Sequence, residues 1–186
     1  MITAIVLASG YSKRMGENKL LLLKDGIPLI EHLLCQLSQV NFHKIIVVTQ
    51  YEEVEKLTKS YGYLSIINGT PQKGISESIK LGVKNTDIGS NFMFFTGDQP
   101  FLRGEVIKKI MNVSEDGYIT VPRLMGKRKS PVVFGKVYRE ELLKLDGDTG
   151  GKEVINKNLN SVKYIDFSSG DDFLDIDTRE EYEKIR

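Results

Sequence analysis

Short apolar runs alternate with helical patterns over the first 110 residues, and this alternation constrains the fold more than any other feature. The runs are nearly continuous and rich in β-branched or aromatic residues, which is typical of strands buried on both faces of a parallel sheet. They are ITAIVLA (2–8), KIIVVTQ (44–50), YLSIIN (63–68) and NFMFFTG (91–97).

Helical patterns fill the intervals between these runs. Pro28 opens the first predicted helix, where its missing N–H costs nothing, and Leu29, Leu33, Leu34 and Leu37 form its apolar stripe. Three further helices are predicted over 52–60, over 75–84 with Ile75, Ile79 and Val83 at helical spacing, and from about Arg103 with Val106, Ile107, Ile110 and Met111 on one side.

Strand–helix–strand repetition predicts parallel pairing through right-handed crossovers, with helices on both faces of the sheet. The fold class expected is therefore α/β, a three-layer αβα Rossmann-like fold. After about residue 117 the pattern loosens into short strands (YITVP, SPVVFG, SVKYIDF and FLDID) and helices near 136–145 and 151–158. This indicates a mostly parallel sheet with an antiparallel strand in its second half. No linker or repeat interrupts the 186 residues, so one domain, 1–186, is expected.

The formal net charge of +1 argues against nucleic acid or anionic lipid as a partner, so any anion site must be local. Cys35 lies in the apolar pattern LIEHLLCQL and is expected to be a small buried residue. A single cysteine, no signal-peptide pattern and no membrane-spanning run together predict a cytoplasmic protein.

The loop after the first strand, Ser9 to Lys19, combines two glycines with Lys13, Arg14 and Lys19. In open α/β sheets, ligands bind at the carboxyl ends of the strands, where this loop is expected. Glycines let the backbone N–H groups approach phosphate oxygens, and Arg14 and Lys19 can offset phosphate charge. An ordinary surface loop with solvated cations is the alternative.

The spacing excludes the P-loop and the dinucleotide-binding motif G-x-G-x-x-G. Instead, ASGYSKRMGENK (8–19) resembles the nucleotidyltransferase signature loop, L-A-A-G-x-S-x-R-M-G-x-x-K, with Ser9 in place of the usual second alanine. In that family the loop wraps the triphosphate of an NTP. The resemblance implies a nucleotide-binding set from this loop: Leu7, Ala8, Ser9, Gly10, Ser12, Arg14 and Lys19.

Asp98 follows Gly97 at the end of the fourth run and is expected to face the same crevice. Mg²⁺ prefers oxygen ligands and is usually held by one or two carboxylates plus substrate phosphates. A turn-forming aspartate before Gln99-Pro100 is the structural alternative. Gly97-Asp98-Gln99-Pro100, however, resembles the family's metal-binding segment. Together with the resemblance of the first loop, this implies that Arg14, Lys19 and Asp98 are catalytic residues.

The C-terminal segment FLDIDTREEYEK supplies a second carboxylate. Asp175 and Asp177 would share a face if this segment were a strand. The spacing also predicts that Asp177 or Thr178 caps a last helix, and we assign Asp177 mainly to capping. Asp175 is therefore the second candidate Mg²⁺ ligand, because related transferases often place one there.

Within the superfamily the chain most resembles the molybdenum cofactor cytidylyltransferases. NGTPQKGISESIKLGV is similar to their N-P-x-x-x-x-G-M-S-x-S-L-x-x-G segment, which implies that Gly74, Ser76 and Ser78 lie at a helix N-terminus beside the nucleotide base. A plain N-cap role for Ser76 is the alternative. LDGDTGGKEVI is similar to the segment containing G-D-x-G-A-R.

The resemblance implies transfer of CMP from CTP to the terminal phosphate of molybdenum-bound molybdopterin, with Mg²⁺ as cofactor and a molybdenum hydroxylase or its chaperone as a further partner. One alternative is a related transferase that uses GTP or a sugar- or alditol-phosphate acceptor. Another is an escort that delivers the cofactor to the hydroxylase. The cations near the expected pterin segments either meet its phosphate or form a solvated rim; they are Arg123, Lys127, Arg128, Lys129 and Lys152.

Overall fold

The computed structural model describes residues 1–168 and 170–186, and its centre is an eight-stranded sheet. The strands of this sheet are β1 (Ile2–Ala8), β4 (Lys44–Thr49), β5 (Leu64–Ile67), β6 (Asn91–Thr96), β7 (Ile119–Leu124), β8 (Lys127–Arg128), β9 (Val132–Phe134) and β10 (Val162–Phe167). A separate antiparallel hairpin consists of β2 (Leu23–Lys24) and β3 (Ile27–Pro28).

The strand order is β10-β7-β9-β6-β1-β4-β5, with β8 paired to β7 outside this path. β1 is central and pairs in parallel with β4 and β6, so that Ile5 lies opposite Ile46 on one side and Phe94 on the other. β4–β5 and β7–β10 are also parallel, whereas β9 runs antiparallel to both β6 and β7. The expected mostly parallel sheet with an antiparallel strand in its second half is confirmed.

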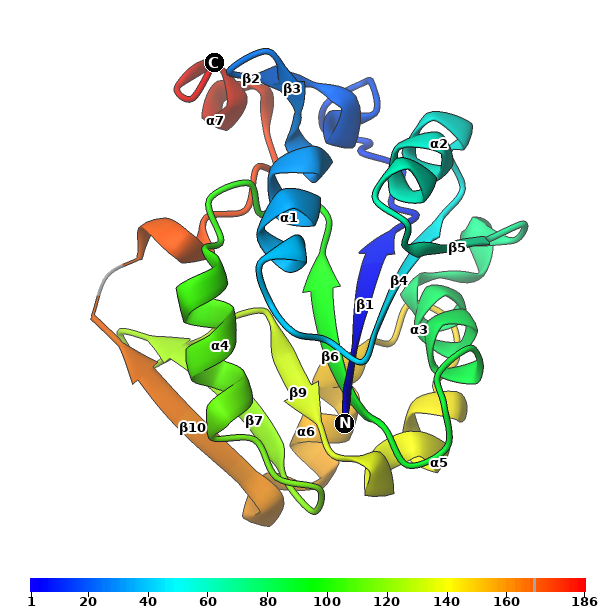
Figure 1. Cartoon of the computed structure of the whole chain (residues 1–186), viewed down its shortest axis with the longest axis vertical. Helices are drawn as coiled ribbons and strands as arrows, with labels where there is room; N and C mark the ends of the chain where they lie inside the picture. Colours follow the sequence, from blue (N-terminus) through cyan, green and yellow to red (C-terminus); the bar gives the residue numbers. More distant parts are fainter. Residues whose placement is uncertain (169) are drawn as a thin grey trace.

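Helices cover both faces of the sheet, which gives the three expected layers (Figure 1). They are α1 (Leu29–Ser38), α2 (Glu52–Ser60), α3 (Ile75–Lys84), α4 (Gly104–Asn112), α5 (Arg139–Leu143), α6 (Gly151–Lys157) and α7 (Arg179–Glu183). Across residues 1–168 and 170–186, none of the helices is long and apolar enough to cross a membrane.

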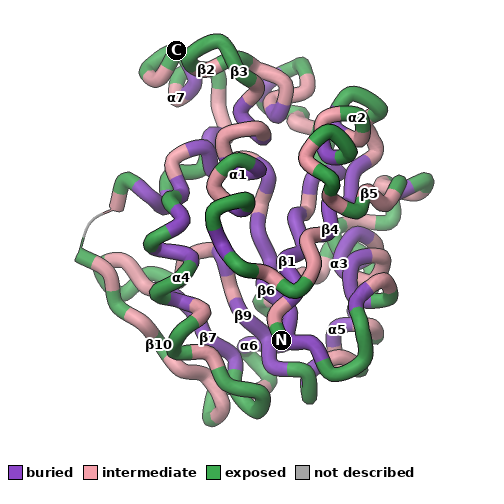
Figure 2. Tube along the Cα trace, in the orientation of Figure 1, coloured by how far each residue is buried: buried purple, intermediate pink, exposed green. Residues whose placement is uncertain are grey.

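Alternation along β1 divides the interior into two cores. Ala4 and Val6 point to one face and pack with α1, α2 and α4, while Ile5 points to the other face and packs with α3, α5 and α6. Buried residues accordingly concentrate along the central strands in Figure 2. Side chains that alternate across a strand thus fix which helices cover which face.

Shorter 3₁₀ turns complete the chain and carry part of the site. They are η1 (Lys19–Leu21), η2 (Pro71–Lys73), η3 (Lys136–Tyr138), η4 (Leu159–Ser161) and η5 (Asp171–Phe173). The C-terminal helix α7 lies beside the β2–β3 hairpin (Figure 1), where the Tyr182 hydroxyl donates to the Leu23 carbonyl at 2.7 Å. The end of the chain therefore returns to the N-terminal third of the molecule.

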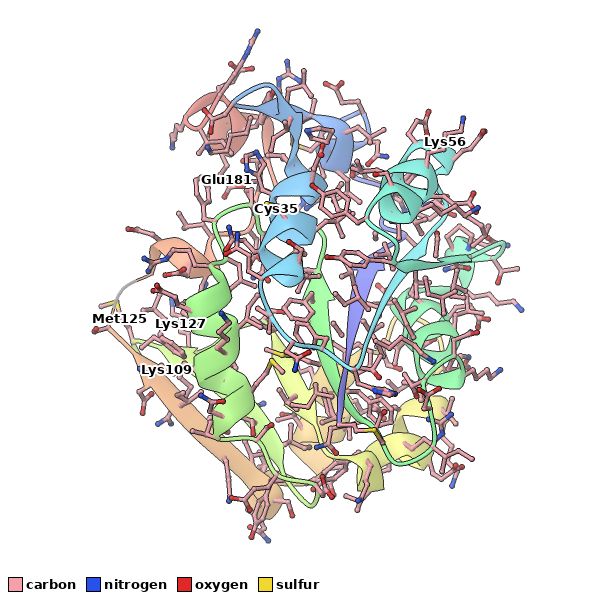
Figure 3. All side chains as sticks on the ribbon, viewed as in Figure 1. Cys35, Lys56, Lys109, Met125, Lys127 and Glu181 are labelled. Carbon is pink, nitrogen blue, oxygen red and sulfur yellow. The ribbon has the colours of Figure 1, made fainter. Side chains whose placement is uncertain are left out.

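Cys35 is exposed, which corrects the expectation of a buried residue. The buried residues of α1 are Leu29, Ile30, Leu33, Leu34 and Leu37, and position 35 falls on the opposite side of the helix. Figure 3 shows Cys35 on α1 among the side chains of this front layer. A residue with apolar neighbours in the sequence can still lie on the exposed side of a helix, because burial depends on its angular position around the helix axis.

Two strand predictions also need correction. The FLDID segment is not a strand; it contains the end of η5 and an irregular stretch whose Ile176 N–H donates to the Asp98 carbonyl at 3.1 Å. The segment crosses the carboxyl end of the sheet and does not extend an edge. β5 is a strand but not a doubly buried one: Leu64 and Ile67 are exposed because β5 is an edge strand.

Candidate active site

A cavity of about 850 Å³ lies at the carboxyl ends of β1 and β6. The loop after β1, the start of α3, the end of β6 and two later segments form its walls. The lining residues are Leu7, Ala8, Ser9, Gly10, Tyr11, Ser12, Lys13, Arg14, Lys19, Leu20, Pro71, Gln72, Lys73, Gly74, Ile75, Ser78, Thr96, Gly97, Asp98, Gly147, Asp148 and Asp177. The two segments that the sequence suggested for triphosphate and metal therefore share one cavity.

The loop after β1 is shaped by local hydrogen bonds and by residues with positive φ. Ser12 has φ of 49° and Gly16 has φ of 75°. The Ser12 carbonyl accepts from the Met15 N–H at 2.8 Å, and its hydroxyl accepts from the Lys19 N–H at 3.2 Å. Met15 is buried against Leu29 and the C-terminal segment. The loop is thus fastened at its far end and directs Lys19 toward the cavity.

Lys19 connects two carboxylates that come from distant parts of the chain. Its Nζ lies 2.5 Å from Asp98 Oδ2 and 2.8 Å from Asp177 Oδ1. Arg14 lies 3.1 Å from the other Asp177 oxygen, Oδ2. The Lys19 and Asp98 side chains are only 14% and 16% exposed, so solvent screens the attraction between them weakly. The resting site is a compact network of two cations and two carboxylates.

The pKa values follow from this network. Burial alone would lower the pKa of Lys19, but the charge of Asp98 and the hydrogen bonds to Asp177 and Asp98 outweigh it, and the pKa is raised. The hydrogen bond from Lys19 lowers the pKa of Asp177, with a further contribution from Arg14. Lys19 is therefore a permanent cation and Asp177 a permanent anion at neutral pH.

Asp98 has one oxygen that the protein does not satisfy. Its Oδ1 is buried without a hydrogen-bond partner among the described residues, and so is Oγ1 of Thr96, two residues earlier. Asp98 lines the cavity, and carboxylate oxygens are suitable ligands for a hard divalent cation. Residues 1–168 and 170–186 contain no cluster of three or more His, Cys, Asp or Glu side chains that could hold a metal alone. The residues present fit a metal whose coordination substrate phosphates and water would complete.

Asp177, not Asp175, faces the cavity beside Asp98. The sequence assignment of Asp177 to capping is wrong, because Thr178 is the N-cap of α7 and forms a reciprocal capping box with Glu181. Asp175 is exposed as a residue, although desolvation of its carboxyl group and the charge of Asp98 raise its pKa to about 6. The Thr178-x-x-Glu181 pattern is typical of a capping box. It could have identified Thr178 as the N-cap and Asp177 as a candidate site residue.

The N-terminus of α3 is closed by a loop from the second half of the chain. Gly74 has φ of 88°, and a Cβ there would lie 2.3 Å from the Gly147 carbonyl oxygen. That carbonyl accepts from the Ser76 N–H at 3.3 Å, and the Asp148 carboxylate lies 3.5 Å from the Ile75 nitrogen. These two N–H groups at the start of α3 are therefore occupied and not free for a nucleotide base.

Of the three residues at the start of α3 that were predicted to bind nucleotide, Gly74 and Ser78 line the cavity. Ser76 is fully buried behind the walls that the described residues form, and its hydroxyl has no partner among them. The α3 N-cap is Gly74, which also rules out the simple capping role for Ser76. Ser78 accepts a hydrogen bond from Asn68 at 3.1 Å, so the residue after β5 is linked to α3 at this wall.

The other polar groups singled out in the sequence lie elsewhere. The five cations Arg123, Lys127, Arg128, Lys129 and Lys152 are not among the cavity residues of the described chain. Arg123 pairs with Asp166 at 2.8 Å on the surface, and Arg128 lies over the Tyr164 ring. These surface contacts agree with the alternative in which the cations form a solvated rim and do not meet a substrate phosphate.

A cation-rich loop that faces an aspartate at the carboxyl end of this three-layer α/β fold lies where open α/β sheets bind their ligands. Residues 4–162 match the family model described as MobA-like NTP transferase domain, and the chain belongs to this family. It is therefore a nucleotidyltransferase.

Curated relatives align over nearly the whole chain. A protein of Pyrococcus horikoshii named as a probable molybdenum cofactor guanylyltransferase is 27% identical, over 97% of this chain and 96% of its own length. A similarly named protein of Bacillus cytotoxicus is 26% identical, over 99% and 96%. The purine catabolism protein PucB of Bacillus subtilis is 23% identical, over 100% and 96%.

Solved structures share the fold. A nucleotidyl transferase from Methanothermobacter superposes with a TM-score of 0.86 at 21% identity, over 100% of this chain and 96% of its own. Rv0371C of Mycobacterium tuberculosis, in a structure described as a complex with manganese, gives a TM-score of 0.84 at 21% identity, over 99% and 97%. At this identity the likeness establishes the architecture.

Proposed function

We propose that the protein transfers CMP from CTP to the terminal phosphate of a molybdopterin-type acceptor, giving the cytosine dinucleotide and pyrophosphate. The observation that carries this proposal is the meeting of Lys19 and Arg14 with Asp98 in one cavity, with Lys19 Nζ 2.5 Å from Asp98 Oδ2. A carrier protein has no need for such a set of phosphate and metal ligands.

In the proposed reaction an acceptor phosphate oxygen attacks the α-phosphorus of CTP, and the bond to the pyrophosphate oxygen breaks. The acceptor is itself the nucleophile, so the chain contributes positioning and charge stabilisation. Arg14 and the backbone of the first loop hold the leaving pyrophosphate. Lys19 exchanges its carboxylate partners for the α-phosphate oxygens, whose charge increases during attack.

Asp98 and Asp177, which line the same cavity, would hold a Mg²⁺ ion in this proposal. When bound, that ion neutralises charge on the phosphate oxygens. Asp175 is the weaker candidate because it is not among the cavity residues of the described chain. Asp177 binds Lys19 and Arg14 in the resting site, so without a metal it competes with phosphate for both cations.

Two sequence features support CTP as the donor. Guanylyl relatives tend to carry a second glycine where this chain has Ser9, and the segment KGISES (73–78) resembles the cytidylyl type. Gly74 and Ser78 from that segment line the cavity beside the first loop. The base is therefore proposed to lie along the start of α3.

GTP is the second candidate donor, because two relatives aligned over nearly their full length are named as guanylyltransferases. Pyrophosphate release with each of the four NTPs and Mg²⁺, with and without the molybdopterin acceptor, distinguishes the two donors. Acceptor-dependent release with CTP is expected. If pyrophosphate were released preferentially with GTP, GTP and not CTP would be the donor. Acceptor-dependent release with neither nucleotide would contradict the transfer to molybdopterin.

Site variants test the chemistry itself. Lys19→Ala and Asp98→Ala should each lower kcat by about 10²–10³ while the protein stays folded, since each removes charge stabilisation at the reacting phosphate. Lys56→Ala, on the exposed side of α2, is the matched lysine control and should keep full turnover. Wild-type turnover by a folded Lys19 or Asp98 variant would refute the assignment. Cofactor transfer to an apo-hydroxylase without CTP consumption would favour the escort.

A further inference from the structure

Three consecutive carbonyls, from the last residue of β1 and the first two residues of the loop after it, are held by three consecutive side chains that begin at the last residue of β4. Thr49 Oγ1 donates to the Ala8 carbonyl at 3.1 Å. Gln50 Nε2 donates to the Ser9 carbonyl at 2.8 Å, and the Tyr51 hydroxyl donates to the Gly10 carbonyl at 2.7 Å. We call Thr49, Gln50 and Tyr51 the carbonyl clamp.

The clamp fixes the direction of the peptide planes. In a regular strand successive carbonyls alternate in direction, whereas these three all meet the same neighbouring segment. A trans peptide is planar, and its C=O and N–H point in opposite directions. The N–H groups of Ser9, Gly10 and Tyr11 must then point away from the clamp.

The side opposite the clamp is the cavity. Ser9, Gly10 and Tyr11 line it, whereas the clamp residues do not appear among its described walls. These three N–H groups have no acceptor within residues 1–168 and 170–186. A Cβ added at Gly10 would meet no described atom within 4 Å, so this face of the backbone is uncovered. Consecutive free N–H groups form an anion-binding concavity.

Each clamp donor is committed to its carbonyl. The Thr49 hydroxyl accepts from the Tyr51 N–H at 3.1 Å, so its own proton is free for the Ala8 carbonyl. Burial raises the pKa of Tyr51, so its hydroxyl stays protonated and remains a donor. Ser9 adds a bond in the opposite direction, from its hydroxyl to the Val48 carbonyl at 3.1 Å.

We infer that Thr49, Gln50 and Tyr51 are positioning residues that preorganise the backbone N–H groups of Ser9, Gly10 and Tyr11 for the polyphosphate of the donor nucleotide. This inference rests on the proposed nucleotidyl transfer, in which the first loop holds the leaving pyrophosphate. The clamp contributes without touching substrate, because it supplies in advance the backbone orientation that an anion would otherwise have to induce.

The test uses isosteric variants, Tyr51→Phe and Thr49→Val, with inorganic pyrophosphate and the free nucleoside as separate calorimetric ligands. Each variant should weaken pyrophosphate and NTP binding about 3- to 10-fold, the effect of one hydrogen bond, and leave nucleoside binding unchanged. KM for the NTP should rise by the same factor in turnover assays. A purely structural role would shift the melting temperature without this division between phosphate and nucleoside.

Matched controls lose the same type of bond elsewhere. Tyr63→Phe removes a tyrosine hydroxyl bonded to the Leu34 carbonyl at 3.2 Å, and Thr58→Val removes a buried threonine hydroxyl bonded to the Val54 carbonyl at 2.7 Å. Both should keep wild-type pyrophosphate affinity even if the melting temperature falls.

Wild-type pyrophosphate affinity in folded Tyr51→Phe and Thr49→Val proteins would overturn the clamp, as would the absence of pyrophosphate binding by the unmodified protein. If the unmodified protein bound pyrophosphate but turned over no NTP, the proposed function would fail. In that case the pyrophosphate affinity of Tyr51→Phe and Thr49→Val would still show whether the clamp orients the N–H groups.

Discussion

Gly74 allows two distant segments to meet at the cavity wall. Its φ of 88° is a left-handed conformation, and its Cα faces the Gly147 carbonyl so closely that no side chain fits between them. The contact joins the α3 segment to the loop that follows α5. The sequence placed both segments in motif order, but only the structure shows that they touch.

Gly74→Ala should lower the free energy of unfolding by about 3 kcal/mol or more, since backbone strain adds to a collision with backbone atoms. Gly62→Ala is the matched control: Gly62 also has positive φ, 72°, but a Cβ there meets no described atom within 4 Å. It should cost only about 1 kcal/mol. Urea unfolding of both variants measures the difference, and equal losses would show that the Gly147 contact is unimportant.

Asp177 and Thr178 are adjacent but have separate roles. Thr178→Ala removes the side-chain cap of α7 and should cost about 1 kcal/mol of stability, with nucleotide affinity unchanged. Asp177→Asn keeps the cap and should strengthen metal-free pyrophosphate binding, because Lys19 and Arg14 lose a competing negative charge. Urea unfolding and calorimetry measure the two effects. Weaker metal-free binding in Asp177→Asn would contradict the competing role.

At the scale of elements, helix α1 is held in place by the packing of one face against the core, while its other face is exposed. Its buried residues pack on the same side of the sheet as α4, whereas Cys35 projects from the other side of the helix. Replacing a buried leucine of α1 or replacing Cys35 removes a small apolar group in both cases, but the leucine is packed in the core and Cys35 is in contact with solvent. The energetic consequences should differ accordingly.

Leu34→Ala should cost about 2–5 kcal/mol, because it removes buried methyl groups and leaves a cavity in the core. Cys35→Ala should change stability by less than about 0.5 kcal/mol. Thermal unfolding compares the two. In addition, a thiol reagent should label Cys35 in the native protein without denaturant, and protection of the thiol until unfolding would contradict its exposed position.

At the scale of the whole molecule, the C-terminal segment is attached to the rest of the chain at several places, two of which lie near the site and at the start of α4. Ile176 and Asp177 bind near Asp98 and Lys19, as described above. Asp172, almost fully buried, accepts two hydrogen bonds from the Arg103 guanidinium at 2.8 Å each. These attachments bring the last fifteen residues of the chain, including a site carboxylate, back to the cavity.

The Asp172–Arg103 pair should make stability depend on acid pH. The hydrogen bonds from Arg103 lower the pKa of Asp172 below its ordinary value of 3.8, so the folded state binds this proton more weakly than the unfolded state. The contribution is complete above pH 3.8 and is lost as pH falls through the lower folded pKa. The stability advantage of the wild type over Asp172→Asn should therefore shrink below about pH 4.

The melting temperature of both proteins, measured between neutral pH and acid, checks this prediction. Asp166→Asn is the control, since Asp166 makes a similar pair with Arg123 on the surface, where such pairs contribute little. An Asp172→Asn difference that stayed constant with pH would show that the pair is not the cause.

The sequence predicted the layered fold because periodicity records burial directly. The runs that became β1, β4 and β6 are apolar on both faces, and helices α2 and α3 have the predicted bounds of 52–60 and 75–84. The loop cations and Asp98 could also be anticipated, because they follow strands whose carboxyl ends must lie together in a parallel sheet. Their roles in catalysis remain predictions.

The sequence by itself determined the order of strands and helices, the family and the placement of Lys19 and Asp98 at one end of the sheet, since all of these depend on local pattern and on parallel pairing. Only the tertiary structure decided that Asp177 joins the site, that the loop at Gly147 occupies the N–H groups of α3, and that Cys35 faces outward. Such contacts join residues far apart in the chain, and local periodicity carries no information about which distant groups will meet.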